Sequence, residues 1–156
     1  MRDRYARNIT YLRLSVTDLC SLRCRYCMPA GGVPKRDRRD VCSLEELVEI
    51  TQAAVDCGVR KVRLTGGEPL VRRGILDICR GISAISEVEE LCLTTNGAAL
   101  SQLAKPLREA GVSRLTFSRS TPASRRGFAS WERAAPLVVR HSSSTSEMAE
   151  DRKSVV

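Results

Sequence analysis

The chain of 156 residues carries 26 Lys and Arg against 18 Asp and Glu, a formal net charge of +8, and only 4% of its residues are aromatic. Its length allows one compact domain with a modest core. Seven irregularly spaced cysteines argue against a secreted disulfide framework, and no apolar run reaches the length of a membrane span. We therefore expect a soluble intracellular protein, whose positive charge suits polyanionic partners such as nucleotides or nucleic acid.

Strand and helix patterns alternate along the chain. Four segments have the alternation or composition of β-strands, namely 11–17, 61–65, 90–95 and 114–118. Three segments between them place apolar residues at helical spacing, namely 44–55, 75–85 and 100–110. Ser43 and Glu46 form a capping box before the first predicted helix, and Pro106 predicts a late start or a kink in the third. This order predicts an α/β fold with a parallel sheet.

Three motifs directly follow predicted strands: the cysteine loop 20–27, Thr65-Gly-Gly-Glu-Pro69 and Thr94-Thr-Asn-Gly97. Because functional residues of parallel α/β folds gather at the carboxyl ends of the strands, we expect these loops to converge on one edge. After residue 118 the strand–helix rhythm stops, and the chain becomes rich in Arg, Ser, Ala and Pro. We predict a core domain over 1–118 and an irregular, disordered tail over 119–156.

The segment Cys20-Ser-Leu-Arg-Cys-Arg-Tyr-Cys27 contains three thiols within eight positions. Three thiolates can hold three irons of a cubane cluster and leave the fourth iron open for a small molecule. A structural zinc site would instead need a fourth ligand, for which Cys42 is the only candidate at an unremarkable spacing. Three other cysteines occupy positions typical of small core residues: Cys57, Cys79 and Cys92.

These motifs carry a family resemblance. Cys-x-x-x-Cys-x-x-Cys with an aromatic residue before the last cysteine, followed one unit later by Gly-Gly-Glu-Pro, resembles the radical S-adenosylmethionine enzymes. Within that group, four segments are similar to the GTP cyclases of molybdenum-cofactor biosynthesis: 12–18, 26–29, 62–70 and 93–97. The resemblance covers residues 1–118 and implies part of a (β/α)6 barrel, about three and a half βα units.

The resemblance implies a [4Fe–4S] cluster on Cys20, Cys24 and Cys27, with S-adenosylmethionine on the open iron. One electron would cleave that cofactor, and the resulting radical would start the conversion of GTP to a 3′,8-cyclised nucleotide. By position, five residues match cofactor contacts: Tyr26, Gly66, Gly67, Glu68 and Ser118. Three match GTP contacts: Arg13, Arg63 and Thr94. Without the resemblance, the glycines would be a turn and each arginine a surface charge.

The sequence departs from the family pattern after the fourth strand. The family continues with Ser-Leu-Asp-Ser or Ser-Leu-Asp-Thr, whereas this chain reads Ser118-Arg-Ser-Thr-Pro122. One set of codons for Ser-Leu-Asp-Thr, read from its second base, spells Arg-Ser-Thr-Pro, which suggests a frameshift as the hypothesis. No cysteine follows Cys92, so the second, C-terminal cluster that the resemblance implies has no ligands here. We expect a frameshifted or truncated form that is inactive as a cyclase on its own.

Three alternatives stay open: another radical enzyme with a different substrate, a nucleic-acid-binding module with a structural zinc, and a catalytically inactive fragment. The low aromatic content argues against the nucleic-acid module. The preferred interpretation predicts GTP and a one-electron reductant as partners, neither nucleic acid nor a membrane, and leaves a homodimer open. It places the protein in the cytoplasm of a bacterium or the mitochondrial matrix of a eukaryote.

Overall fold

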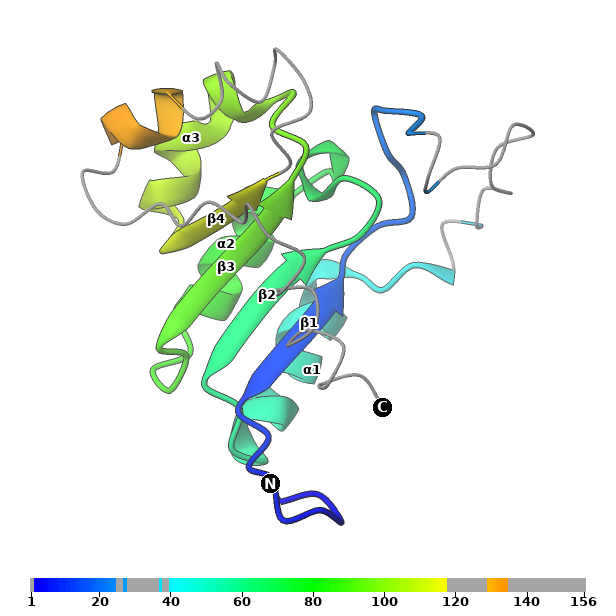
Figure 1. Cartoon of the computed structure of the whole chain (residues 1–156), viewed down its shortest axis with the longest axis vertical. Coiled ribbons are helices and arrows are strands. Elements are labelled where there is room, and N and C mark those ends of the chain that lie inside the picture. Colours follow the sequence, from blue (N-terminus) through cyan, green and yellow to red (C-terminus); the bar gives the residue numbers. More distant parts are fainter. Residues whose placement is uncertain (1, 25–26, 28–36, 38–39, 118–128, 135–156) are drawn as a thin grey trace.

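The computed structural model describes residues 2–24, 27, 37, 40–117 and 129–134. Strands alternate with helices along the chain (Figure 1). The elements are β1 (Tyr11–Ser15), α1 (Leu44–Asp56), β2 (Lys61–Thr65), the 3-10 helix η2 (Pro69–Val71), α2 (Ile75–Ser83), β3 (Glu90–Thr95), α3 (Leu100–Glu109) and β4 (Arg114–Phe117). The predicted α/β order is confirmed. No helix in the described ranges has the length and apolar character needed to cross a membrane.

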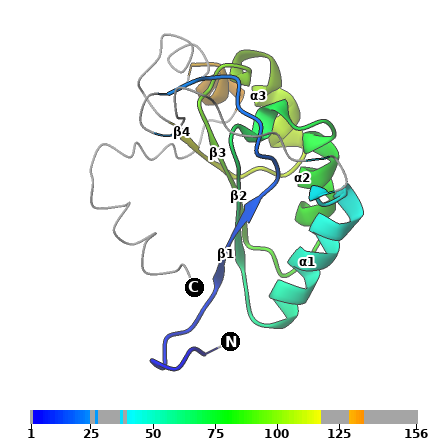
Figure 2. The same ribbon diagram turned by 90° about the vertical axis from the view of Figure 1, so that its right-hand side faces the viewer.

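The four strands form one parallel sheet in the order β1-β2-β3-β4. Each strand pairs with the next one along the chain because a helix carries the chain back to the start of the sheet each time. The helices α1, α2 and α3 all cover the same face (Figure 2). Three βα units and a fourth strand agree with the partial barrel expected from the sequence.

The core lies between the sheet and these helices. Alternate strand residues point to this side, since successive side chains of a strand face opposite ways. Five buried strand residues supply the sheet's share of the core: Val62, Leu64, Leu91, Leu93 and Leu115. Helix residues spaced three or four apart supply the rest, including Leu47, Ile78, Ile82, Leu100 and Leu107, none more than 1% exposed. This packing fixes which side chains face away from the helices.

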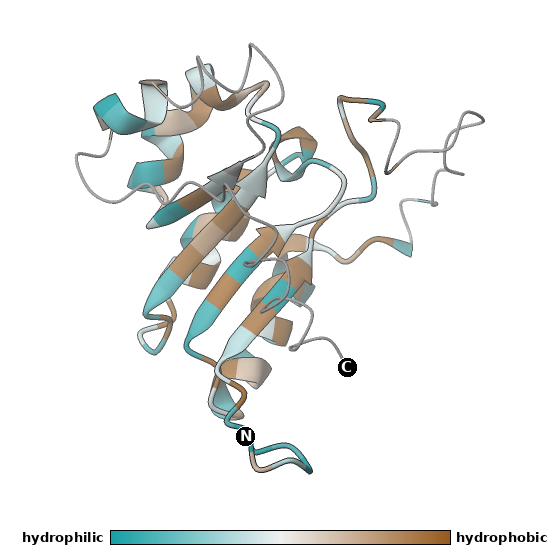
Figure 3. Ribbon diagram, viewed as in Figure 1, coloured by the Kyte–Doolittle hydropathy of each residue, from teal (hydrophilic) through white to brown (hydrophobic). Residues whose placement is uncertain are grey.

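The opposite face of the sheet is polar. The strand register places Arg13 beside Arg63 and Arg63 beside Cys92, while Thr94 pairs with Thr116. Partners in a parallel register point to the same side, so these side chains share the face that α1, α2 and α3 leave uncovered. The alternation of hydrophilic and hydrophobic residues along the strands is visible in Figure 3.

Several element boundaries differ from the predicted ones. Strand β1 ends at Ser15, two residues before the predicted end, although the Val16 N–H still donates to the Thr65 carbonyl at 3.0 Å. Helix α2 ends at Ser83 rather than at residue 85. The predicted late start of the third helix is wrong, because α3 begins at Leu100 and contains Pro106 in its interior. Local pattern sets the element type more firmly than its ends.

The start of α1 follows the predicted capping box. The Ser43 hydroxyl accepts the Glu46 N–H at 3.1 Å, and the Ser43 N–H donates to a carboxylate oxygen of Glu46 at 2.7 Å. Two backbone donors that the helix cannot satisfy internally are thereby paired. The cap fixes where the chain enters α1 after the cysteine loop.

A short helix over 129–134, orange in Figure 1, lies next to α3 and was not expected from the sequence. Its Trp131 is fully buried in the core, and the guanidinium of Arg108 lies 5.3 Å from the centre of the Trp131 ring. Burial of so large a side chain offsets the poor helix signal of the surrounding sequence. These six residues are therefore ordered, unlike the tail predicted after residue 118; the domain boundary itself stays a prediction.

Candidate functional site

Three loops leave the carboxyl ends of β1, β2 and β3 and lie along one edge of the sheet (Figure 1). They carry the cysteines, the Gly66-Gly67-Glu68 segment and the Asn96-Gly97 turn. The hydrogen bonds described below join the three loops to one another. The convergence expected from the sequence is present in the described residues.

The glycine loop after β2 lies directly against the chain that leads to the first cysteine. The Gly67 N–H donates to the Thr17 carbonyl at 2.8 Å, and the Glu68 N–H donates to the Leu19 carbonyl at 2.7 Å. A Cβ added at Gly66 would lie 2.3 Å from the Thr17 oxygen, and one added at Gly67 would lie 2.3 Å from the Leu19 oxygen. Both positions therefore require glycine for a close contact between two backbones.

This contact gives the two glycines a role that sequence reasoning did not find. From the sequence, the family resemblance matched both glycines to cofactor contacts. In the structure, the close neighbour is the backbone of residues 17–19, and Gly66 also has a φ of +146°, which favours glycine. Two consecutive glycines in a sequence do not indicate which segment of the chain will pack against them.

Glu68 joins the second loop to the third. Its side chain is buried, at 2% exposure, and its carboxylate accepts hydrogen bonds from the Leu70 N–H at 3.1 Å, the Thr95 hydroxyl at 2.7 Å and the Asn96 N–H at 2.6 Å. A buried carboxylate is costly unless such donors surround it. Sequence matching placed Glu68 among the cofactor contacts; all three of these partners are groups of the protein itself.

Asn96 extends this connection to the first loop. Its side-chain oxygen accepts the Ala98 N–H at 2.9 Å. Its side-chain NH2 group donates to the Ser21 hydroxyl at 3.1 Å and points to the Cys20 sulfur at 3.9 Å. The sequence marked Asn96 only as a turn residue, although its position after a strand that carries a matched motif was a usable signal.

The three loop cysteines differ in exposure. Cys20 and Cys24 are half-buried and Cys27 is exposed. The Cys20 sulfur accepts the Leu22 N–H at 3.4 Å, and the Cys27 N–H and thiol both donate to the Cys24 carbonyl, at 3.2 and 3.7 Å. Backbone groups thus hold the loop in a turn between its second and third thiols.

The two preceding thiols affect Cys27 electrostatically. Desolvation raises the pKa of the Cys27 thiol, and the neighbouring Cys24 and Cys20 raise it further. A cation bound to all three would reverse this effect, because it stabilises each thiolate. Within the described ranges, no three His, Cys, Asp or Glu side chains are gathered closely enough to hold a single metal ion.

Arg63 lies on the polar face of the sheet, with its side chain reaching across β3 to β4. Its Nη1 donates to the Thr116 hydroxyl at 3.2 Å, and its guanidinium carbon lies 5.6 Å from the centre of the Tyr11 ring. Its Nε is buried without a hydrogen-bond partner among the described residues. These contacts from β1 and β4 fix the arginine over the sheet.

The other predicted site residues fall in two groups. Arg13 is exposed beside Arg63, and Thr94 is half-buried on the same face. Tyr26 and Ser118 lie outside the described residues. The structure thus brings Arg13, Arg63 and Thr94 to one face and the cysteines to its edge.

The cysteines outside the loop behave in two ways. Cys79 and Cys92 are buried, as predicted, and burial is the largest cause that raises the pKa of each thiol to about 12. Cys92 also donates to a Glu90 carboxylate oxygen at 2.9 Å, which disfavours its thiolate. Cys57 is exposed at the end of α1, so its predicted core position is wrong. Helix spacing alone cannot tell a core position from an exposed C-cap.

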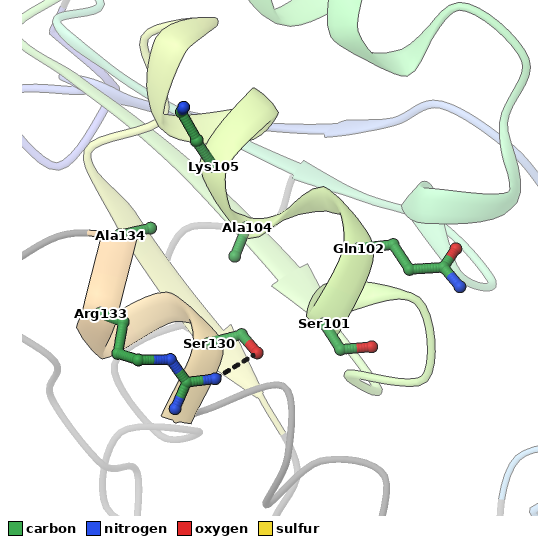
Figure 4. A pocket seen from close by; sticks show the side chains of 7 residues that line it. All are labelled: Ser101, Gln102, Ala104, Lys105, Ser130, Arg133 and Ala134. Carbon is green, nitrogen blue, oxygen red and sulfur yellow. Dashed lines mark hydrogen bonds between the residues drawn. The ribbon is translucent and has the colours of Figure 1, made fainter.

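A cavity of about 450 Å³ lies away from these loops, between α3 and the helix over 129–134 (Figure 4). Small and polar side chains line it, with Lys105 and Arg133 as its two basic residues. Arg133 is held by a hydrogen bond to the Ser130 hydroxyl at 3.2 Å. None of the residues that line this cavity belongs to the three convergent loops.

Curated relatives share the site-bearing part of the chain. The chain is 50% identical over 118 residues to a GTP 3′,8-cyclase of Alkaliphilus oremlandii and 54% identical over 116 residues to one of Geobacter sulfurreducens. A GTP 3′,8-cyclase of Pseudomonas savastanoi pv. phaseolicola is 50% identical over 118 residues. These matches cover 74–76% of this chain and 35–37% of the relatives, so the chain spans little more than a third of their length.

The fold and a family match agree with these relatives. A crystal structure of BtrN in complex with AdoMet and 2-DOIA superposes with a TM-score of 0.60 at 18% identity, over 81% of this chain and 55% of BtrN. That likeness concerns the fold alone. The family described as the radical SAM superfamily matches residues 14–136, which include the cysteine loop and both companion loops. The chain belongs to the radical SAM superfamily.

Proposed function

We propose that this chain is the cluster-bearing and S-adenosylmethionine-binding portion of a GTP 3′,8-cyclase of molybdenum-cofactor biosynthesis. The observation that carries the proposal is the contact of the Gly66-Gly67-Glu68 loop with residues 17–19, which fixes the cysteine loop at the edge of a polar sheet face. About 50% identity to relatives that bear this name over the same residues supports it.

Cys20, Cys24 and Cys27 would each bind one iron of a [4Fe–4S] cluster. Thiolates are the usual ligands of such clusters, and the bonds from Cys27 to the Cys24 carbonyl hold two of the three thiols on one turn, so the chemistry of the donor set fits the group. When bound, the cluster supplies the electron that splits S-adenosylmethionine. The protein itself would hold the thiols in a turn and keep them at the edge formed by the carboxyl ends of the strands.

The cofactor contacts would come from two sets of residues. Gly66, Gly67, Tyr26 and Ser118 match family contacts to S-adenosylmethionine, and the first two lie directly against residues 17–19, which lead into the cysteine loop. Glu68 would act through its neighbours, because its carboxylate already accepts three hydrogen bonds from its own loop and the next. Its carboxylate would fix the position of the Gly66-Gly67-Glu68 loop relative to the end of β3.

The substrate would lie over the polar face of the sheet. Arg63 presents a guanidinium that Thr116 and Tyr11 hold in place. Planar guanidinium groups suit phosphate oxygens and purine edges, and Arg13 stands beside it in register. Thr94 adds a hydroxyl on the neighbouring strand. These groups give GTP a cationic surface next to the cluster edge.

Anaerobic reconstitution of the chain with ferrous iron and sulfide tests the proposal. We expect about one [4Fe–4S] cluster per chain, measured as iron and sulfide content and as brown absorbance. Cys24→Ala should lose the cluster, whereas Cys57→Ala, which removes an exposed cysteine outside the loop, should retain it. Bound zinc in a colourless protein, or equal iron in both variants, would refute the assignment.

A second experiment concerns the reaction. With a strong one-electron reductant, the reconstituted 156-residue chain should cleave S-adenosylmethionine to 5′-deoxyadenosine. We expect no cyclised GTP from these residues alone, because the matched part spans only about 37% of the relatives that carry the name. Detection of the cyclised nucleotide by mass spectrometry would show that this part suffices.

A further inference from the structure

Asn96 is held at three of its atoms, each by a different part of the site. Its backbone N–H donates to Glu68 at 2.6 Å, and its side-chain oxygen accepts the Ala98 N–H at 2.9 Å. Its side-chain nitrogen faces Ser21 at 3.1 Å and the Cys20 sulfur at 3.9 Å. This side chain therefore has one orientation rather than several.

The contact with Ala98 decides which end of the amide faces the cysteine loop. A flipped amide would set its NH2 group against the Ala98 N–H, two donors with no acceptor between them. The oxygen must therefore face Ala98, and the NH2 group must face Cys20 and Ser21. A hydrogen-bond donor is thus aimed at a sulfur that the proposed function makes an iron ligand.

We infer that Asn96 is a positioning residue that raises the reduction potential of a cluster bound by Cys20. The inference rests on the proposed function, since it needs the cluster. Hydrogen bonds to ligand sulfurs withdraw electron density and favour the more negative, reduced cluster. The contact is long for a neutral thiol, and a thiolate at Cys20 makes it a charge-assisted hydrogen bond. Asn96 would thereby make the cluster easier to reduce, and it would lower the driving force for passing the electron on to the cofactor.

An ordinary structural role for Asn96 makes a different prediction. Asn-Gly is a common turn sequence, and the bond from the Ala98 N–H to the Asn96 side chain is the usual stabilising contact of such a turn. Asp in this place keeps that acceptor and nearly the same shape, but it turns an oxygen toward Cys20 instead of a donor. Asn96→Asp therefore distinguishes a role in stabilising the turn from an effect on the reduction potential of the cluster.

Ser21 provides the matched control. If Asn96 acted only by pinning the loop through the Ser21 hydroxyl, Ser21→Ala would have the same effect as a change at Asn96. If it acts on the Cys20 sulfur, Ser21→Ala leaves the potential near that of the unchanged chain. Asn96→Ala removes the donor without adding a charge and serves as the second variant.

The test is a potentiometric titration of the reconstituted 156-residue chain, with the reduced cluster followed by electron paramagnetic resonance. We expect the reduced-to-oxidised ratio at a fixed potential to fall about tenfold in Asn96→Asp, a shift of about 59 mV to more negative potential for a one-electron couple. Asn96→Ala should shift in the same direction by less, and Ser21→Ala should hardly shift.

The possible outcomes distinguish a failure of the inference about Asn96 from a failure of the proposed function. Equal potentials in Asn96→Asp, Asn96→Ala and the unchanged chain would overturn the inference while leaving the cluster in place. A Ser21→Ala shift equal to that of Asn96→Ala would also overturn it in favour of loop pinning. Failure of the unchanged chain to take up iron would refute the proposed function and this inference with it.

Discussion

The hydroxyl of Thr95 donates to the buried carboxylate of Glu68 at 2.7 Å, across 27 residues of sequence. The same hydroxyl accepts the Gly97 N–H at 3.0 Å, so the carboxylate is the centre of a small network that holds two loops. Groups in such a network cannot be removed singly without leaving buried donors unsatisfied.

Glu68→Ala should therefore lower the free energy of unfolding by about 3 kcal/mol, because it strands a hydroxyl and two N–H groups. Urea unfolding followed by circular dichroism measures this. Glu49→Ala removes an exposed carboxylate of α1 and should change the free energy by less than about 0.5 kcal/mol. Equal losses in the two variants would mean that the network contributes nothing of its own.

Gly67→Ala should displace the cysteine loop, because its new Cβ would lie 2.3 Å from the Leu19 carbonyl oxygen. Backbone cannot move aside as a flexible side chain can, so we expect a loss of about 1–3 kcal/mol together with poor iron uptake. Gly74→Ala is the control: its Cβ would meet no atom closer than 3.9 Å, although its φ of +76° costs about 1 kcal/mol. Normal iron uptake by Gly67→Ala would contradict the proposed packing role.

Arg63→Ala should weaken GTP binding by about tenfold or more, since a hydrogen bond to a charged group is worth about 1.5–3 kcal/mol. Arg73→Ala removes an exposed arginine that lies in the segment before α2, and it should leave the affinity unchanged. Isothermal titration calorimetry at constant salt compares the two. An equal loss of GTP affinity in both variants would mean that only the net charge of the protein matters, and not the position of Arg63.

The buried thiol of Cys79 should make the fold weaker in alkali. Its pKa is raised to about 12, whereas an ordinary thiol has a pKa of 9.0. Between these values the unfolded chain has lost the proton and the folded chain keeps it, so stability falls as pH rises from 9 toward 12, by at most about 1.4 kcal/mol per pH unit. Cys79→Ala should be less stable at pH 8 but should show a shallower decline, measured by urea unfolding at pH 8 to 10.5. If the free energy of unfolding fell equally with pH in both proteins, the Cys79 thiol would not be the source of the pH dependence.

Trp131 is the single tryptophan of the chain, and it is fully buried. Its fluorescence should be blue-shifted in the native protein and should shift to the red on unfolding. Trp131→Ala should cost about 3–5 kcal/mol, as large truncations in a core do. Emission like that of free tryptophan under native conditions would show that the helix over 129–134 does not dock.

Much of the fold could be predicted because its signals are local. The hydrophobic alternation of 61–65 and the capping box at Ser43 each arise from neighbours in sequence, and both lead directly to an element. The helix over 129–134 escaped prediction because its stability comes from the burial of Trp131 beside α3, a contact that composition does not reveal.

The candidate site likewise has a part that the sequence predicts and a part that it does not. The loops that hold Cys20, Gly67 and Gly97 could be placed at one edge from strand order alone. The contacts of Glu68 with Thr95 and of Asn96 with Cys20 could not, since each spans a distance in sequence that no period or spacing encodes. Their residue types fit an ordinary polar loop, and only the folded arrangement distinguishes them.

The link between Asn96 and Cys20 also has a consequence for biogenesis. Cys20 leaves the ribosome 76 residues ahead of Asn96, and its loop is held by backbone groups at Gly67 and Glu68 that also follow it. The cysteine loop therefore acquires its contacts with the other two loops only after three strands have been made and paired. A cluster on these thiols would therefore be inserted after β1, β2 and β3 have paired, rather than into the emerging cysteine loop.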